Sequence, residues 1–152
     1  MQTYIVFIAL LILTYLGFKM GRARAVTASG GRLSVLHSLP AYHGLYVAIW
    51  CGVPSFLLVA LWVVLEPSIV TGLVVSDLPQ NMQKLSEARL NLLLNDIRNI
   101  ATGNIASGEP DPAVIAAAER YNSLLVTSAA AKFVIGLCIA IAGIILGRRY
   151  LE

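Results

Sequence analysis

Two histidines, His37 and His43, lie six residues apart in the stretch LHSLPAYHG and are the first candidates for chemistry. Histidine nitrogens bind zinc and transfer protons, so such a pair could form part of a metal site or an acid–base site. No cysteine or acidic residue lies beside them in the sequence, so a zinc site lacks its remaining ligands. We therefore interpret the stretch as a polar turn between two apolar segments, in which Pro40 interrupts helix formation.

The other reactive side chains also lack the partners that catalysis requires. Cys51 and Cys138 lie within apolar segments, which favours small buried hydrophobic side chains over a disulfide or a metal site. Glu119 and Arg120 are adjacent opposite charges, a pattern typical of a solvated helix face. The remaining candidates are Glu87, Ser55, Thr127 and Ser128. No motif surrounds any of them, so the sequence predicts no enzyme, no cofactor and no metal.

The segments that carry these residues are mostly apolar. Hydrophobic residues make up 58% of the 152 residues and charged residues only 12%, whereas a typical soluble domain has about 25% charged residues. One aqueous core of this size cannot bury so much apolar surface, so we expect a lipid bilayer to cover it. The net charge is +3, but the basic residues form no stripe with aromatic residues, which argues against nucleic-acid binding.

Three apolar segments are long enough to form membrane helices, which need about 20 residues. They are residues 1–20, 45–65 and 128–147. The first is at the short end of the range, and its basic residues follow the apolar stretch. That order favours a retained anchor over a cleaved signal peptide. The predicted fold is an all-α membrane protein with three transmembrane helices.

Basic residues flank these segments unevenly, and cytoplasmic loops are enriched in Lys and Arg. The residues expected to set the topology are Lys19, Arg22, Arg24, Arg32, Arg148 and Arg149. Residues 66–131, in contrast, hold four basic and seven acidic residues. We therefore expect a multi-pass protein of the bacterial inner membrane with an outside N-terminus. Residues 21–44 and 148–152 are then cytoplasmic, and residues 66–127 are extracytoplasmic.

The extracytoplasmic segment, residues 66–127, is predicted to form a helical hairpin. Its first helix spans residues 76–103, with Ser76 or Asp77 as the cap, Pro79 in the first turn and Gly103 at the end. The second helix begins at Pro112, capped by Asp111, and continues without a breaker through the third membrane segment to Arg149.

The start of this second helix is a candidate phosphate site, because backbone N–H groups at a helix N-terminus attract anions. Glu109, Asp111 and Glu119 surround that end and would repel phosphate. The sequence therefore favours an interaction surface here over direct phosphate binding.

Small residues and a proline indicate how the membrane helices pack. Pro54 lies in the middle of the second segment, where it removes a backbone hydrogen bond and should bend the helix. The freed carbonyl needs cover in lipid, so we expect a neighbouring helix on that side. In the third segment, Gly136, Ala140, Gly143 and Gly147 lie on roughly one face, which lets helix backbones approach closely. This face is expected to pack either on the first two helices of the chain or on a transporter core. Replacing Gly143 with leucine should disrupt this packing.

The stretch GRARAVTASGGRLSVLHSLPAYHGLYVAIW, which follows the first apolar segment, resembles a known family. It is similar to the N-terminal extension of PstC-type permease subunits of the phosphate-specific ABC importer. The resemblance extends to AVIAAAERYNSL, residues 113–124, and to GRRY, residues 147–150, and is most specific over residues 36–50. It implies as partners a permease core, the partner permease subunit, the ATPase subunit and the extracytoplasmic phosphate-binding protein.

A permease of that family continues into a transporting core that this sequence does not contain. No transport residue can therefore be carried over, and a fragment, an excised domain and a separate gene product all remain open. The resemblance implies an accessory region that acts in anchoring, assembly or docking of the binding protein, without forming the pore. The alternatives are a sensor or signalling input module with an extracytoplasmic helical domain, and a small standalone subunit of another membrane complex.

Overall fold

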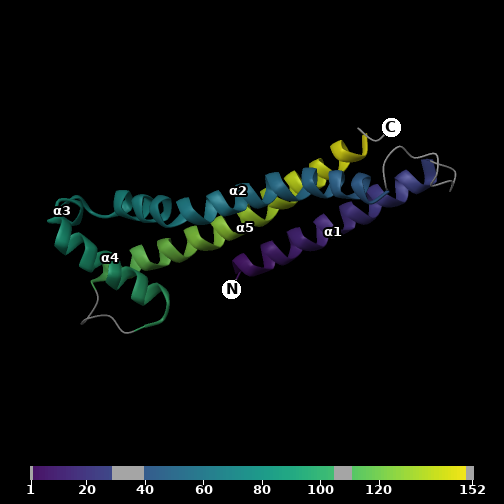
Figure 1. Ribbon diagram of the computed structural model, residues 1–152. Coiled ribbons are helices and arrows are strands. Elements are labelled where there is room, and N and C mark those ends of the chain that lie inside the picture. The colour runs from purple at the N-terminus through teal and green to yellow at the C-terminus, as the bar shows by residue number, and fades with distance from the viewer. Residues whose placement is uncertain (1, 29–39, 105–110, 150–152) are drawn as a thin grey trace. The chain divides into compact units, whose positions relative to one another are not determined.

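The computed structural model describes residues 2–28, 40–104 and 111–149, and these ranges contain helices joined by short connections. The elements are α1 (Gln2–Ala28), α2 (Pro40–Asp77), α3 (Gln80–Gln83), α4 (Glu87–Ala101) and α5 (Pro112–Arg149), as Figure 1 shows. No strand occurs within the described ranges. The predicted all-α class is therefore confirmed for this part of the chain.

Three helices are long and apolar enough to cross a membrane, as the sequence predicts. They are α1 from Thr3, α2 and α5, and the last two have 38 residues each. At 1.5 Å per residue, a helix of that length extends over ~57 Å, whereas the hydrocarbon layer of a bilayer is ~30 Å thick. Both α2 and α5 are therefore longer than a membrane crossing requires.

The helices extend beyond the membrane segments expected from the sequence. The helix α1 continues to Ala28 and α2 begins at Pro40, so the connection expected over residues 21–44 is helical at both of its ends. Proline suits the first position of a helix because its missing N–H has no intrahelical acceptor there. His37 and Arg32 lie outside the described residues.

The start and end of α5 agree with the prediction from the sequence. The Asp111 side chain accepts a hydrogen bond of 2.9 Å from the backbone N–H of Ala113, which is the interaction of an N-cap residue. Arg148 and Arg149 lie in the last turn, where their charges favour the carbonyl end of the helix. The predicted single helix from Pro112 to Arg149 is therefore confirmed.

The helix predicted over residues 76–103 is wrong in its first half. Ser76 and Asp77 are the end of α2 and cap no new helix, and the four-residue α3 is separated from α4. The Gln83 side chain donates hydrogen bonds of 3.1 Å and 2.6 Å to the carbonyls of Ser76 and Leu78. These contacts satisfy backbone acceptors that the end of α2 leaves without partners. Gly103, with φ of +78°, follows the end of α4 as predicted.

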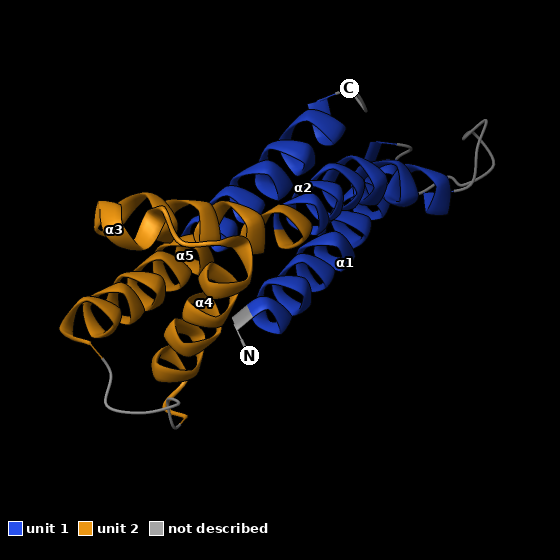
Figure 2. Ribbon diagram, turned by 90° about the vertical axis from the view of Figure 1, so that its left-hand side faces the viewer, with its two compact units in different colours: residues 1–62, 131–152 blue, residues 63–130 orange. Residues whose placement is uncertain are grey.

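The chain divides into two compact units, coloured separately in Figure 2. Unit 1 comprises residues 1–62 and 131–152, and unit 2 comprises residues 63–130. In unit 1, a core of buried side chains joins α1, α2 and α5, and the rings of Phe7 and Phe56 stack with centroids 5.9 Å apart. The buried members of this core are Val6, Leu10, Val47, Cys51, Val59, Ala140 and Ile144.

Unit 2 has a core of its own, to which α4 contributes a fully buried Ile97. The other buried side chains come from the end of α2, from the residue that follows it and from the start of α5, and they are Val74, Leu78, Val114, Ala117 and Ala118. Arg120 donates a hydrogen bond of 3.0 Å to Asp77, and Arg98 donates one of 2.9 Å to Thr71. Unit 2 is therefore a small helical cluster with an apolar centre and polar links at its surface.

Candidate functional site

The small residues singled out on α5 lie against the other helices of unit 1. Ala140 is fully buried, and a Cβ atom on Gly136 would lie 3.3 Å from the side chain of Val59. A Cβ atom on Gly147 would lie 3.2 Å from the backbone Cα of Val47. Any side chain larger than glycine at these two positions would press on α2.

The closest approach of α5 to α2 is at Gly143. A Cβ atom at this position would overlap the carbonyl oxygen of Trp50 and would lie 2.8 Å from the Cα of Cys51. Pro54 lies four residues after Trp50 in α2, and proline has no N–H to donate to that carbonyl. Pro54 cannot donate the hydrogen bond that the Trp50 carbonyl normally accepts within a helix. The backbone of α5 covers this carbonyl instead.

The contact between α1 and α2 uses glycines that the sequence reasoning missed. A Cβ atom on Gly21 would lie 2.7 Å from the carbonyl oxygen of His43, and one on Gly44 would lie 2.7 Å from the carbonyl oxygen of Phe18. Gly17 also lies against α2, near Val47. The signal was present, because Gly17 and Gly21 have the same four-residue spacing as Gly143 and Gly147.

The two cysteines have different environments. Both are free thiols, and Cys51 is buried in the core of unit 1, as predicted. Cys138 is exposed, so the prediction of a buried side chain is wrong for this residue. It lies on α5 two residues before Ala140, and that offset turns it away from the buried face of the helix.

The buried polar side chains within the described ranges are Ser55 and Lys132. The Ser55 hydroxyl donates to the carbonyls of Cys51 and Gly52 in its own helix, at 2.6 Å and 2.9 Å. This is the local bonding by which serine is accommodated in an apolar helix. In unit 2, the Ser128 hydroxyl instead donates to the Glu66 carboxylate, on another helix. Ser55 and Ser128 therefore act as hydrogen-bond donors within the fold.

The residues considered for catalysis and metal binding do not gather in one place. Among residues 2–28, 40–104 and 111–149, no group of three His, Cys, Asp or Glu side chains could hold a metal ion. His43 begins the second turn of α2, and Arg120 pairs with Asp77 in unit 2 at a point where both side chains are 52% exposed. Where the structure describes them, these side chains are thus spread over both units.

The basic residues singled out for topology partly converge. Arg24 on α1 lies beside the same pocket as Arg148 and Arg149 on α5. Lys19 instead places its Nζ atom 5.8 Å from the centre of the Tyr15 ring, in a cation–π arrangement. Unit 1 therefore gathers positive charge where α1 and α5 both approach their C-terminal ends.

Comparison with known proteins identifies the family. A family model described as phosphate ATP-binding cassette transporter matches residues 7–106, which is well over half of the chain. No curated protein and no solved structure gives a significant match. The matched range includes residues 36–50, where the sequence resemblance was most specific, and it runs from α1 past the end of α4. Together with three helices able to cross a bilayer, this match shows a membrane protein that belongs to the phosphate ATP-binding cassette transporter family.

Proposed function

We propose that this chain is the N-terminal membrane region of a permease subunit of a phosphate ABC importer. In this role it anchors and helps to assemble the transporter, without forming the pore. The family match over residues 7–106 is the observation that carries the proposal.

The exposed apolar surface of the long helices supports a role in anchoring and assembly. In the most apolar windows of α1, α2 and α5, only 22%, 33% and 28% of the residues are buried. The remaining surface needs lipid or another apolar protein surface to cover it. A region whose function is to hold a permease core in the membrane requires both kinds of contact.

The distribution of charge supports one orientation of the chain. Residues 1–20, 45–65 and 128–147 cross the bacterial inner membrane, with the N-terminus outside. Residues 21–44 and 148–152 face the cytoplasm, where loops are rich in Lys and Arg. Residues 66–127 face outward, which is the side on which an extracytoplasmic binding protein meets its permease.

The surface of α4 supports docking of that binding protein. One face of α4 is packed in unit 2 through the fully buried Ile97, whereas Leu92 on the same helix is 67% exposed. Polar residues surround Leu92, since Arg89, Asn91 and Asn95 are exposed as well. Protein interfaces combine an apolar centre with a polar rim, and we propose that Leu92 and its polar neighbours contribute to such a surface.

Affinity purification from membranes in mild detergent tests the proposal. The permease core, its partner permease, the ATPase subunit and the phosphate-binding protein should be enriched with the tagged chain. Recovery of the chain without any importer subunit would overturn the proposal. Recovery with a signalling protein alone would instead favour a sensory input module.

A matched pair of variants tests docking separately from assembly. Leu92→Ser removes the exposed apolar side chain, whereas Asn91→Ser shortens an exposed polar neighbour to the same residue and removes no apolar surface. We expect Leu92→Ser to lower recovery of the binding protein while the permease and ATPase subunits remain. Equal recovery of the binding protein with both variants would contradict docking through this face of α4.

A further inference from the structure

A pocket of about 420 Å³ lies between α1 and α5 in unit 1, close to the C-terminal ends of both helices. Three arginines line it: Arg24 from α1, and Arg148 and Arg149 from α5. The rest of its described lining is apolar, from Met20 and three isoleucines of α5. We propose that this pocket binds one anionic phospholipid, with the phosphate at the arginines and an acyl chain along the isoleucines.

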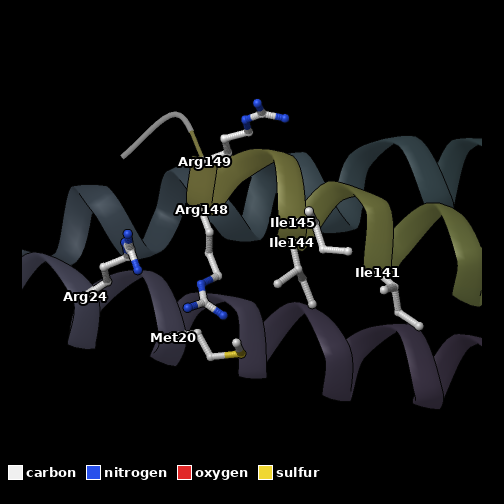
Figure 3. A pocket seen from close by; sticks show the side chains of 7 residues that line it. All are labelled: Met20, Arg24, Ile141, Ile144, Ile145, Arg148 and Arg149. Carbon is white, nitrogen blue, oxygen red and sulfur yellow. The ribbon is translucent and has the colours of Figure 1, made fainter. Parts of the chain in front are cut away.

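The arrangement of the arginines suits a phosphate group. Figure 3 shows the Arg148 side chain reaching from α5 toward α1 near Met20, and Arg24, on α1, lines the same pocket. Arg149 points away from α1. The planar guanidinium group matches the oxygens of a phosphate in a two-pronged contact, so two converging groups can hold one phosphate from two helices.

The local electrostatics favour an anion despite the helix ends. The carbonyl end of α5 carries a partial charge of roughly −0.5, which repels anions. Three guanidinium groups each carry a full positive charge, and the described lining includes no Asp or Glu. The described lining is therefore positively charged, which attracts anionic ligands.

The apolar wall decides between a lipid and free phosphate. Ile141 and Ile145 are 48% and 61% exposed, and Ile144 continues the same surface into the core of unit 1. Inorganic phosphate can satisfy the arginines but leaves these isoleucines uncovered. A phospholipid supplies both the phosphate oxygens and the hydrocarbon, and basic pockets between membrane helices are known to recognise anionic headgroups.

The three arginines lie where the headgroup of a bound lipid is expected. Arg148 and Arg149 directly follow the apolar part of α5, and Arg24 follows the apolar part of α1, so all three lie where each helix leaves the hydrocarbon. This inference rests on helices that cross a bilayer and holds whether or not the chain docks a binding protein.

The test uses the full chain, purified in neutral detergent and titrated with short-chain phosphatidylglycerol or phosphatidylcholine. Native mass spectrometry measures the fraction of protein that carries lipid. We expect phosphatidylglycerol to bind at least about tenfold more tightly than phosphatidylcholine, since only the former has a net negative charge. Equal binding of the two lipids would overturn the proposal.

Arginine variants with the same change in net charge locate the site. Arg148→Gln and Arg24→Gln remove the two converging groups, whereas Arg22→Gln removes an exposed arginine of α1 that does not line the pocket. We expect about tenfold weaker phosphatidylglycerol binding for the first two variants and less than about twofold for Arg22→Gln. Equal losses for all three would show diffuse attraction and overturn the site.

Two further measurements keep the interpretation unambiguous. The thermal midpoint in detergent without added lipid should be the same for all three variants. A loss of lipid binding then cannot be explained by a loss of folded protein. Inorganic phosphate at millimolar concentration should leave phosphatidylglycerol bound. Displacement of the lipid by inorganic phosphate, with the same dependence on Arg148, would identify a free-phosphate site and overturn the lipid proposal.

Discussion

The contact between Gly143 and α2 gives a sharp prediction about stability. In the structure, a Cβ atom at Gly143 overlaps the Trp50 carbonyl oxygen and lies 2.8 Å from the Cα of Cys51. Both neighbours are backbone atoms, so no side chain can rotate to make room. Gly143→Ala therefore forces α5 and α2 apart, and Gly143→Leu adds a larger side chain at the same point.

The size of the effect follows from this geometry. Carbon atoms attract best at ~3.5 Å or more, so the 2.8 Å contact with the Cα of Cys51 alone requires the helices to separate by roughly 0.7 Å, and the overlap with the Trp50 carbonyl requires more. A gap of 0.5–1 Å already loses about a quarter to a half of each neighbouring van der Waals contact. Inserting a methyl group into a packed interface costs about 1–3 kcal/mol, and we expect Gly143→Ala in the upper half of that range.

Gly72 provides the matched control. It also lies in a long helix, α2, but a Cβ atom there would meet no atom within 4 Å. Gly72→Ala makes the same chemical change and should be neutral or stabilising by up to about 1 kcal/mol, through helix propensity alone.

The assay is unfolding of the purified chain in mixed micelles with increasing denaturing detergent, followed by tryptophan fluorescence. The backbone of Trp50 forms the contact, and a Trp62→Phe background leaves Trp50 as the single emitting tryptophan. Gly143→Ala should lower the midpoint and Gly143→Leu should lower it further. A Gly143→Ala protein as stable as Gly72→Ala would refute the claim that a backbone contact at Gly143 holds α5 on α2.

Three further predictions concern unit 2. Ile97→Ala should lower the free energy of unfolding by about 2–4 kcal/mol because Ile97 is fully buried, and it should speed hydrogen exchange in α4. Leu92→Ala, at a 67% exposed position, should do neither. Equal hydrogen exchange in the two variants would contradict the packing of Ile97. Asp111→Ala removes the cap of α5 and should cost about 1 kcal/mol, seen as faster exchange in its first turn only. Arg120→Gln breaks an ion pair with Asp77 in which both side chains are 52% exposed, so it should lower the free energy of unfolding by about 0.2–1 kcal/mol. A shift in thermal midpoint as large as that of Ile97→Ala would contradict this prediction.

Much of the helix architecture could be predicted from the sequence because it depends on local chemistry. The helix from Pro112 to Arg149 has a cap before it, no breaker inside it and a basic last turn. The three apolar segments have the length that a bilayer demands. The break between α3 and α4 was missed, because Gln83 contacts the end of α2 only once the chain has turned back on itself.

The candidate contacts were predictable only in part. Helical periodicity alone places Gly136, Ala140, Gly143 and Gly147 near one face of α5. Tertiary packing decides which helix contacts that face, and it also places Gly143 on the Trp50 carbonyl. The arginines were recognised for their charge, but Arg24 and Arg148 line one pocket only because α1 and α5, from opposite ends of the chain, pack near each other.

The orientation of the chain in the membrane is tested most directly by labelling single cysteines. In a Cys51→Ala, Cys138→Ala background, Asn95→Cys on α4 and Thr27→Cys near the end of α1 introduce thiols at exposed positions. A membrane-impermeant thiol reagent added to intact spheroplasts should label the cysteine at position 95 at once, and the one at position 27 only after the membrane is permeabilised. Labelling at position 27 with protection at position 95 in intact spheroplasts would contradict the proposed membrane topology.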